Sequence, residues 1–348
     1  MGIILGLFAR AAAKAVFILA VAAACAAFLY TDVTAPGPLL APRTLVIGKH
    51  LGLSGVARLL AQAGVIRDPL SFELAAILDG RARRLEAGEY AFPARTETLQ
   101  AIAIIASGKV VEHPLTIPEG LTSEEVARLV RAAPELAGAL SKAPKEGAVL
   151  PQTYFYTYGQ SRKALIARMR RAMAQALAAA WSKRRQGLPL SSPRELLILA
   201  SLVEKEAKKP EEKAHIAAVF LNRLKLGMPL QSDPTVIYAL SDDGRKAFDP
   251  PLTRADLAVE SPYNTYREKG LPPGPIDNPG SAALLAAARP APSEDLYFVA
   301  DGDGGHVFSR SLEGQDKNVS LYRRIEATKA AKASFLAARK AAAAASAR

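Results

Sequence analysis

Cysteine is almost absent from this chain of 348 residues, which contains only Cys25. A single cysteine excludes a disulfide within the chain and a metal site built from cysteines. The histidines His50, His113, His215 and His306 form no HxxxH or HxH pair, so a histidine metal site is not expected either. We therefore expect a protein that carries neither a metal nor another cofactor.

Aromatic residues are also few, at 6%, whereas half of the residues are apolar, which together with abundant alanine favours a helix-rich protein. A chain of this length can hold one transmembrane element and one or two domains with cores of their own. The formal net charge is +12, and a basic body suits an anionic polymer or surface. Because the basic residues are dispersed without interleaved aromatics, we expect solvated helical faces and no nucleic-acid partner.

An uncharged apolar run, "AVFILAVAAACAAFLY", lies near the N-terminus and follows Arg10 and Lys14. If Lys14 snorkels, the run is long enough for a membrane helix, which we place at residues 15–33. The positive-inside rule then keeps residues 1–14 in the cytoplasm, and the body after the single span faces the periplasm from the inner membrane. Two alternatives stay open, namely a cleaved signal peptide and a lipoprotein with its lipid on Cys25.

The segment after this run predicts a linker and a small domain. Residues 34–42 are rich in proline and glycine, and we interpret them as a linker that lifts the body off the membrane. Residues 43–117 alternate strand and helix signals, which predicts an α+β module with helices packed on a small sheet. Asp68 and Pro69 mark the start of one helix, and Thr96 marks the start of another. With no reactive cluster in it, the module is either a recognition unit or a spacer.

The stretch "LASLVEKEAKKP" predicts the end of a helix whose start signals are clear. Ser192 is a good N-cap, Pro193 stands at the first helical position, and Glu195 completes a capping box. A second helix is expected at residues 210–225, and the tight connection at residues 208–210 predicts that the two helices pack as a pair. At the other end of the chain, the Ala/Lys-rich tail of residues 326–348 is either a frayed helix or disordered.

The two glutamates of "VEKE" are not equivalent on this helix. At about 100° per residue, Glu206 falls within the apolar arc formed by Leu199, Leu202 and Val203. Glu204 falls on the opposite side, where we expect it to face water. Burial disfavours the charged form of a carboxylate, so the pKa of Glu206 should rise and suit a general acid near neutral pH. The alternative is a frayed helix end at which Glu206 simply reaches solvent.

Polar residues follow the second helix around a proline. Gln231, Ser232, Asp233 and Thr235 either cap the start of another helix or line a polar groove near the glutamate. Farther along, "GLPPGPI" predicts a rigid loop with a scaffolding role. "DGDGGH" lacks a glutamate at the twelfth position of a calcium loop, so we interpret it as a hairpin turn between two strands.

The stretches "LASLVEKEA", "VFLNRLKLGMPLQSDPTVIYAL", "SPYNTYREKGLPPGPIDNPG", "AALLAAARP" and "DLYFVADGDGGHVF" resemble the endolytic murein transglycosylase family, also called YceG-like proteins. The similarity runs from about residue 150 to residue 308. It implies an α+β protein with an N-terminal transmembrane helix, a LysM-like module that binds glycans, and a helix-rich catalytic domain at residues 118–325. It also implies peptidoglycan strands as substrate, with peptidoglycan synthases as partners beside the lipid bilayer.

In this family one glutamate, which corresponds to Glu206, cuts the β-1,4 bond between N-acetylmuramic acid and N-acetylglucosamine and leaves a 1,6-anhydro end. The resemblance further suggests a set of substrate-binding residues, for which loop structure is the alternative: Gln231, Ser232, Asp233, Tyr263, Asn264, Thr265 and Tyr266. A non-catalytic membrane-tethered scaffold is the competing function, and a hydrolase that yields a reducing end is a third.

Overall fold

The structure is a computed structural model that describes residues 2–246, 248 and 251–346. Helices and short strands alternate along the chain, which confirms the predicted α+β class with an apolar helix at the N-terminus. The chain divides into two compact units. The first contains Met1–His113, Glu135–Ala137 and Phe155–Gln160, and the second contains Pro114–Pro134, Gly138–Tyr154 and Ser161–Arg348.

The first unit holds a long helix, three short helices, a 3-10 turn and a pair of strands. Its elements are α1 (Gly2–Thr34), β1 (Arg43–Ile47), α2 (Leu53–Gln62), α3 (Pro69–Leu78), η1 (Ala82–Arg84), β2 (Gly88–Phe92) and α4 (Thr98–Ala106). β1 and β2 pair antiparallel. β3 (Glu112–Thr116) does not extend this sheet as the sequence suggested, because it pairs with β4 (Thr153–Thr157) from much later in the chain.

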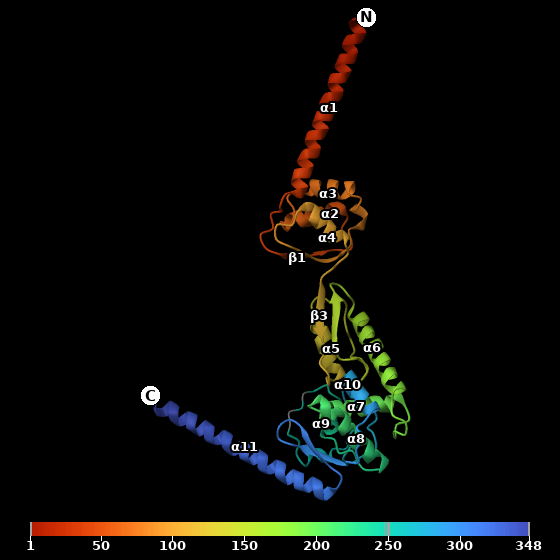
Figure 1. Ribbon diagram of the computed structural model, residues 1–348, viewed down its shortest axis with the longest axis vertical. Helices are drawn as coiled ribbons and strands as arrows, with labels where there is room; N and C mark the ends of the chain where they lie inside the picture. The colour runs from red at the N-terminus through yellow and green to blue at the C-terminus, as the bar shows by residue number, and fades with distance from the viewer. Residues whose placement is uncertain (1, 247, 249–250, 347–348) are drawn as a thin grey trace. The chain divides into compact units, whose positions relative to one another are not determined.

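Among the described residues, α1 is the one helix that is long and apolar enough to cross a membrane (Figure 1). Its apolar part is Ala12–Thr34, 23 residues with a mean hydropathy of 2.3, and its most apolar stretch of 18 residues is not buried. At about 1.5 Å per residue, such a helix covers the roughly 30 Å of a hydrocarbon core. This apolar helix is compatible with single-pass anchoring.

The segment after α1 is packed rather than free, which corrects the prediction of a spacer at residues 34–42. Val33 in the last turn of α1 and Leu39 beyond it are both buried in the core of the first unit. The backbone N–H of Gly37 donates to the carbonyl of Arg95, and the Arg95 N–H donates to the carbonyl of Leu39. The proline and glycine residues of this segment therefore pack against the module. No free linker separates α1 from it.

The helix starts of the module agree with the sequence at one position and differ at another. The carboxylate of Asp68 accepts from the Ser71 N–H at 2.7 Å and caps α3 as predicted. α4, in contrast, begins at Thr98 with Glu97 as its N-cap residue. Thr96 is buried and donates its hydroxyl to the Pro93 carbonyl, so it stabilises the preceding turn instead of the helix.

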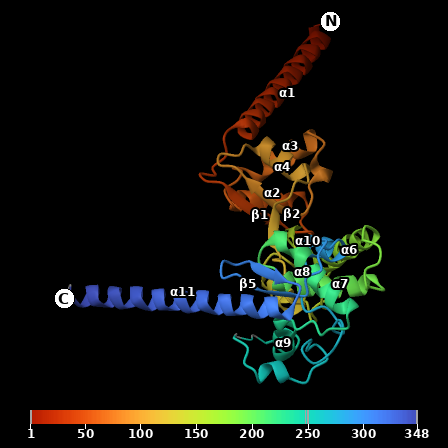
Figure 2. The same cartoon turned by 60° about the horizontal axis from the view of Figure 1, so that its bottom comes forward.

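The second unit is mainly helical. Beside parts of β3 and β4 it contains α5 (Ser123–Ala132), α6 (Arg162–Ser182), α7 (Pro193–Glu206), η2 (Pro210–Glu212), α8 (Lys213–Lys225), α9 (Asp233–Leu240), η3 (Asp256–Ala258), α10 (Ser281–Ala288), β5 (Tyr297–Ala300), β6 (His306–Ser309) and α11 (Leu312–Ser346). The predicted hairpin at "DGDGGH" is present, since β5 and β6 pair antiparallel. Of the predicted tail, residues 326–346 belong to the continuous helix α11 (Figure 2), and residues 347–348 lie outside the described residues.

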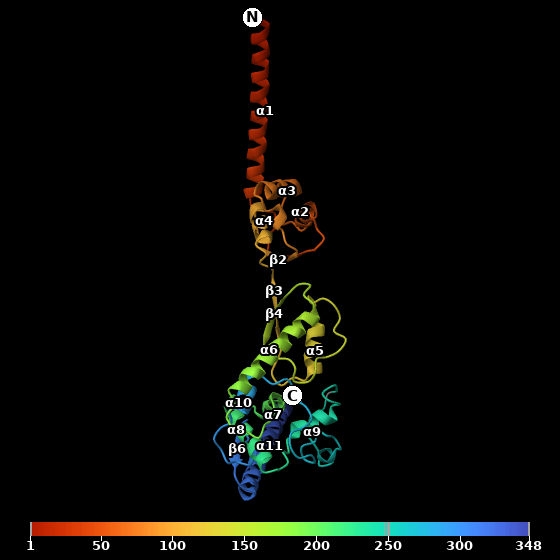
Figure 3. The ribbon, with the colours of Figure 1, turned by 90° about the vertical axis from the view of Figure 1, so that its right-hand side faces the viewer.

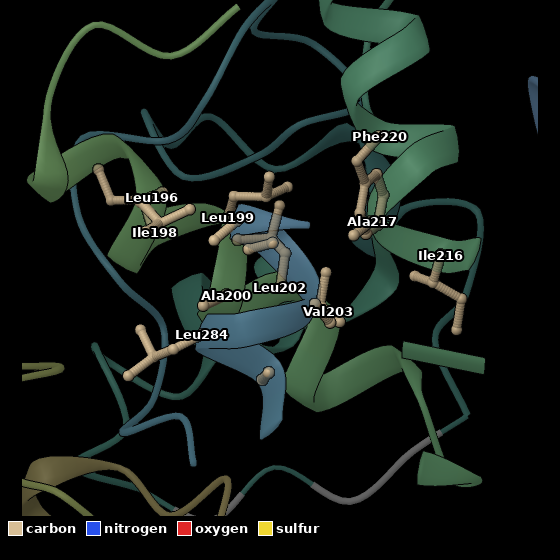
Figure 4. Close-up of a cluster of buried hydrophobic side chains, with 14 of the residues drawn as sticks. Leu196, Ile198, Leu199, Ala200, Leu202, Val203, Ile216, Ala217, Phe220 and Leu284 are labelled. Carbon is tan, nitrogen blue, oxygen red and sulfur yellow. The ribbon is translucent and has the colours of Figure 1, made fainter. Parts of the chain in front are cut away.

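The central element of this unit is α7, which is buried on most of its surface. Leu196, Leu199, Leu202 and Val203 are fully buried, and the core around them includes residues of α8 and α10 (Figure 4). Ser192 caps the helix, because its hydroxyl accepts from the N–H of Glu195 at 3.3 Å. The second half of the predicted capping box is displaced by one residue: the Glu195 carboxylate accepts from the N–H and hydroxyl of the residue before the cap.

Candidate functional site

Glu206 is the last residue of α7 and lies at the end of the buried face of this helix. Leu199, Leu202 and Val203 on the same face are fully buried, whereas Glu206 itself keeps part of its surface accessible. The helix stops there because Ala207 leaves the helical conformation. The residue thus stands at the end of the buried face with part of its surface accessible, and it is not on a frayed end in solvent.

The partner of this carboxylate is a serine from a distant part of the chain. Ser232 donates its hydroxyl to Glu206 Oε1 at 2.6 Å, and its side chain is almost completely buried. Ser232 stands at the N-cap position of α9, yet it makes no side-chain cap bond. Gln231 before it has a φ of +53°, a left-handed conformation that turns the chain so that the serine faces the glutamate. Of the polar residues that follow the second helix, Ser232 is therefore the one that binds Glu206.

A group of buried hydroxyls holds Ser232 in place. The N–H of Ser232 donates to Thr265 Oγ1 at 3.0 Å, and Thr235 Oγ1 donates to the Ser232 carbonyl at 2.7 Å. The two threonine hydroxyls also contact each other at 2.9 Å. Thr235 and Thr265 are both buried, so this network joins α9 to the loop that contains "YNTY". It restricts the serine, and through it the carboxylate, to one arrangement.

The protonation of Glu206 follows from its surroundings. Burial raises the pKa of the Glu206 carboxyl to about 7; the hydrogen bond from Ser232 lowers this pKa, and the negative charge of Asp233 raises it. A carboxyl with this pKa is present in comparable amounts as acid and as base near neutral pH. It can therefore give a proton and later take one back.

The four residues of "YNTY" differ in their burial and in their contacts. Asn264 is fully buried and donates to the carbonyls of Leu257 and Val259, so its amide shapes the loop. Thr265 belongs to the hydroxyl network. Tyr263 is partly buried with its ring 4.9 Å from the ring of Tyr238.

Tyr266 is the member of this loop that binds Asp233. Its hydroxyl donates to Asp233 Oδ1, and burial raises the pKa of the tyrosine. Gln231 and Asp233 are exposed, and Tyr266 is partly exposed. Gln231 and Asp233, which flank Ser232 in the chain, and Tyr266, which binds Asp233, therefore all have accessible surface.

Glu204 does not face water, and the prediction that it would was wrong. Its side chain is 7% exposed and accepts from Lys213 Nζ at 2.7 Å. Its other oxygen accepts from the N–H of Gly280, which precedes α10. The side of α7 opposite the apolar arc is covered by α8 and α10, and the buried charge is compensated there by an ion pair.

Arg223 on α8 was missed by the sequence analysis. The side chain is buried, and its guanidinium donates to the carbonyls of Leu296 at 2.6 Å, Pro229 at 3.1 Å and Leu230 at 3.0 Å. It also donates to the side chain of Gln231 at 3.1 Å. Arg223 thus holds the chain that leads into the Ser232 turn. The available signal was the same as for Glu206, a charged residue within the apolar face of a helix.

Three of the four histidines are paired with carboxylates rather than with one another. His113 contacts Glu89, and His306 contacts Glu212. His215 contacts Asp295. Within the described ranges, no group of three or more His, Cys, Asp or Glu side chains has the arrangement to hold a metal ion.

Comparisons with known proteins place this arrangement in a family. The model of the YceG-like family matches residues 45–321, which include Glu206 and its partners. The endolytic murein transglycosylase of Bacillus subtilis (strain 168) is 45% identical over 131 residues, 38% of this chain and 35% of that protein. That of Streptococcus pneumoniae serotype 2 is 38% identical over 177 residues, 50% of this chain and 32% of that protein. The aligned part is thus about a third of the length of these curated relatives.

A solved structure is similar over a larger part of the chain. The crystal structure of a yceG-like protein from Listeria monocytogenes is 31% identical and has a TM-score of 0.51. The match covers 79% of this chain and 98% of that one. The YceG-like family model also matches most of this chain, at residues 45–321, and the chain therefore belongs to the YceG-like family.

Proposed function

We propose that this chain is a membrane-anchored endolytic transglycosylase that cleaves β-1,4 bonds between N-acetylmuramic acid and N-acetylglucosamine in nascent peptidoglycan strands. The observation that carries the proposal is the state of Glu206, half-buried, bound to Ser232 and with a pKa of about 7. The curated relatives, which are named endolytic murein transglycosylases, support the same reaction class.

Glu206 would act twice in one turnover. In its acid form it gives its proton to the glycosidic oxygen as the bond from that oxygen to C1 of muramic acid breaks. The resulting carboxylate then takes the proton of the C6 hydroxyl of the same sugar while O6 bonds to C1. The carboxyl returns to its acid form, and the product is a 1,6-anhydro end formed without water. A group with a pKa near 7 suits both steps.

The remaining predicted residues divide between sugar contact and support. Gln231, Asp233 and Tyr266 have accessible surface and are proposed to contact the glycan, Tyr266 by its ring. Ser232, Asn264 and Thr265 are buried, so we propose that they orient Glu206 and the loop instead of touching the substrate. Tyr263 is partly exposed, and we propose that it also contacts the glycan, through a smaller surface.

The other parts of the chain complete the proposal. α1 would span the inner membrane once with its N-terminus in the cytoplasm, following Arg10 and Lys14, and the body would face the periplasm. The α+β module is proposed to be LysM-like and to bind glycan. Peptidoglycan synthases are proposed as partners, because an enzyme that cuts new strands would work beside the enzymes that make them.

The decisive experiment is digestion of purified glycan strands by the full chain and by Glu206→Gln. The substitution keeps the shape of the side chain but removes the acid, so we expect cleavage to fall by about 10²–10⁴-fold. Glu294→Gln, at a side chain that is 79% exposed, is the matched control and should keep full activity. Undiminished cleavage by Glu206→Gln would exclude Glu206 as the acid, and no cleavage by the wild-type chain would favour a scaffold.

A hydrolase is the second candidate because Asp233 supplies a further carboxylate beside the Ser232–Glu206 pair. Paired carboxylates are typical of glycoside hydrolases, which add water to the product. Mass spectrometry distinguishes the two reactions, since the anhydro product lacks the mass of one water. Products with reducing ends would replace the proposed reaction by hydrolysis.

A further inference from the structure

α3 presents an apolar face that nothing in the first unit covers. Leu70, Leu74, Ile77 and Leu78 are each more than half exposed, although all four are large and apolar. At about 100° per residue they lie on one side of the helix, opposite the fully buried Phe72. Large apolar side chains gathered on one helical face indicate an interaction surface.

This face lies next to the helix that is proposed to span the membrane. A hollow of about 580 Å³ separates α1 from α3 and is lined almost entirely by apolar groups. Its lining comes from Ala24, Cys25, Ala26, Phe28 and Leu29 of α1 and from Asp68, Leu70, Ser71 and Leu74 of α3. In all three views α3 lies at the end of the module where α1 enters, and β1 and β2 lie at the far end (Figures 1, 2 and 3).

Basic residues follow the apolar face. The chain leaves α3 through "RARR", in which Arg81 is paired with Asp79, whereas Arg83 and Arg84 are exposed. A helix with an apolar face and adjacent arginines is typical of segments that lie in a membrane interface. The apolar side chains enter the acyl region, and the arginines meet anionic headgroups.

We propose that the exposed face of α3 is immersed in the bilayer beside α1 and that Arg83 and Arg84 bind anionic phospholipid headgroups. The inference rests on the proposed membrane anchoring by α1. The bilayer is the occupant that the structure favours, because Val33 is buried in the module core and leaves no free spacer to separate the module from the membrane. Two contacts with the bilayer, one through α1 and one through α3, fix the orientation of the module relative to the membrane.

The lone cysteine makes a direct test practical. In a Cys25→Ala background, single cysteines introduced as Leu74→Cys and Ile77→Cys carry an environment-sensitive fluorophore, and the full chain is reconstituted in phosphatidylglycerol-containing vesicles. Quenchers attached to the lipid tails report immersion in the bilayer. We expect both labels to shift to shorter wavelength and to lose most of their fluorescence.

Two control labels separate this inference from the anchoring on which it rests. A label at Ile18→Cys on α1 should be quenched, and a label at Val46→Cys on β1 should not. If the α1 label is quenched and the α3 labels are not, the inference is wrong while the anchor stands; if none is quenched, both are wrong. α3 labels shielded from aqueous iodide yet not quenched by lipid would indicate a protein partner, which also overturns the inference.

The headgroup contact has its own measurement. Replacing phosphatidylglycerol by a zwitterionic lipid should reduce the quenching of the label at Ile77→Cys, and Arg83→Ser with Arg84→Ser should have the same effect in anionic vesicles. The Ile18 label should respond to neither change. Quenching at α3 that is independent of lipid charge and of both arginines would overturn the headgroup contact.

Discussion

The carboxyl of Glu206 shows how the position of a single residue in a helix determines its chemistry. Its base belongs to the buried face of α7, so desolvation raises its pKa to about 7, and Ser232 limits the shift by stabilising the charged form. Asp233 acts in the opposite sense to Ser232 through its charge. The acid strength of Glu206 is therefore a balance of burial with two neighbours, Ser232 and Asp233, and each neighbour can be altered separately.

The pH dependence of cleavage should report this balance. Because the acid form of Glu206 starts the proposed reaction, kcat/KM should fall as pH rises above about 7, by about tenfold for each pH unit. Ser232→Ala removes the hydrogen bond that lowers the pKa of Glu206, so the alkaline limb should move to higher pH while the maximal rate falls. The measurement is the pH profile of strand cleavage under subsaturating conditions.

Ser182→Ala is the control for this profile, because the Ser182 hydroxyl donates only to an exposed carbonyl at the end of α6. Its profile should match that of the wild-type chain. A limb that stays in place in Ser232→Ala, or a wild-type limb far from pH 7, would show that another group controls the reaction.

At the scale of elements, the side chain of Glu204 joins the three helices α7, α8 and α10. Glu204 on α7 accepts from Lys213 on α8 and from the N–H of Gly280 at the start of α10. The side chains of Lys213 and Glu204 are only 6% and 7% exposed. Since Glu204 lies two residues before Glu206, this contact fixes the end of α7 from the side opposite the Glu206 carboxyl.

Lys213→Met should destabilise the chain by about 3–5 kcal/mol, because it leaves the Glu204 carboxylate buried without its cation. Adding Glu204→Gln should recover part of the loss, since the remaining group is then neutral. Thermal and urea unfolding measure both effects. Lys317→Met is the matched control: its pair with Glu313 has side chains 74% and 79% exposed, and the cost should be below about 0.5 kcal/mol. Equal losses for the two lysines would contradict a structural role for the buried pair.

At the scale of the whole molecule, the junction between α1 and the module decides how the module is attached. Gly37 packs so closely that a Cβ there would lie 2.2 Å from the Thr96 carbonyl oxygen and 2.5 Å from that of Val65. Together with Val33 and Leu39 in the core, this contact makes the junction part of the module. Motion of α1 is therefore transmitted to the module without a hinge in this segment.

Gly37→Ala should destabilise the first unit by about 1–3 kcal/mol, because backbone atoms must move to admit the methyl group. Hydrogen exchange should increase at residues 33–39 and around Thr96. Gly48→Ala is the control, since an added Cβ there meets only the side chain of Leu51 at 3.9 Å. If the two variants exchange alike, the segment is a free linker after all.

The sequence alone determined the local features of this protein. Apolar periodicity and capping residues predicted the helix that ends at Glu206, and the uncharged run predicted α1, because both depend on neighbours in the chain. The same reasoning placed Gln231, Ser232 and Asp233 near the glutamate only as one of two alternatives, since nothing local joins residues so far apart.

The tertiary structure decided which polar groups are buried. A helical wheel shows which residues share a face of α7 but not that α8 and α10 cover the opposite face, so Glu204 was expected in water and lies in an ion pair instead. Gly37 lies in a segment whose proline and glycine content suggested a flexible linker, and its close packing could not be predicted from that content. Arg223 was missed for the same reason, because its carbonyl partners come from other segments. Burial is a property of the assembled fold, and for that reason a sequence specifies the residues of a site more readily than their environment.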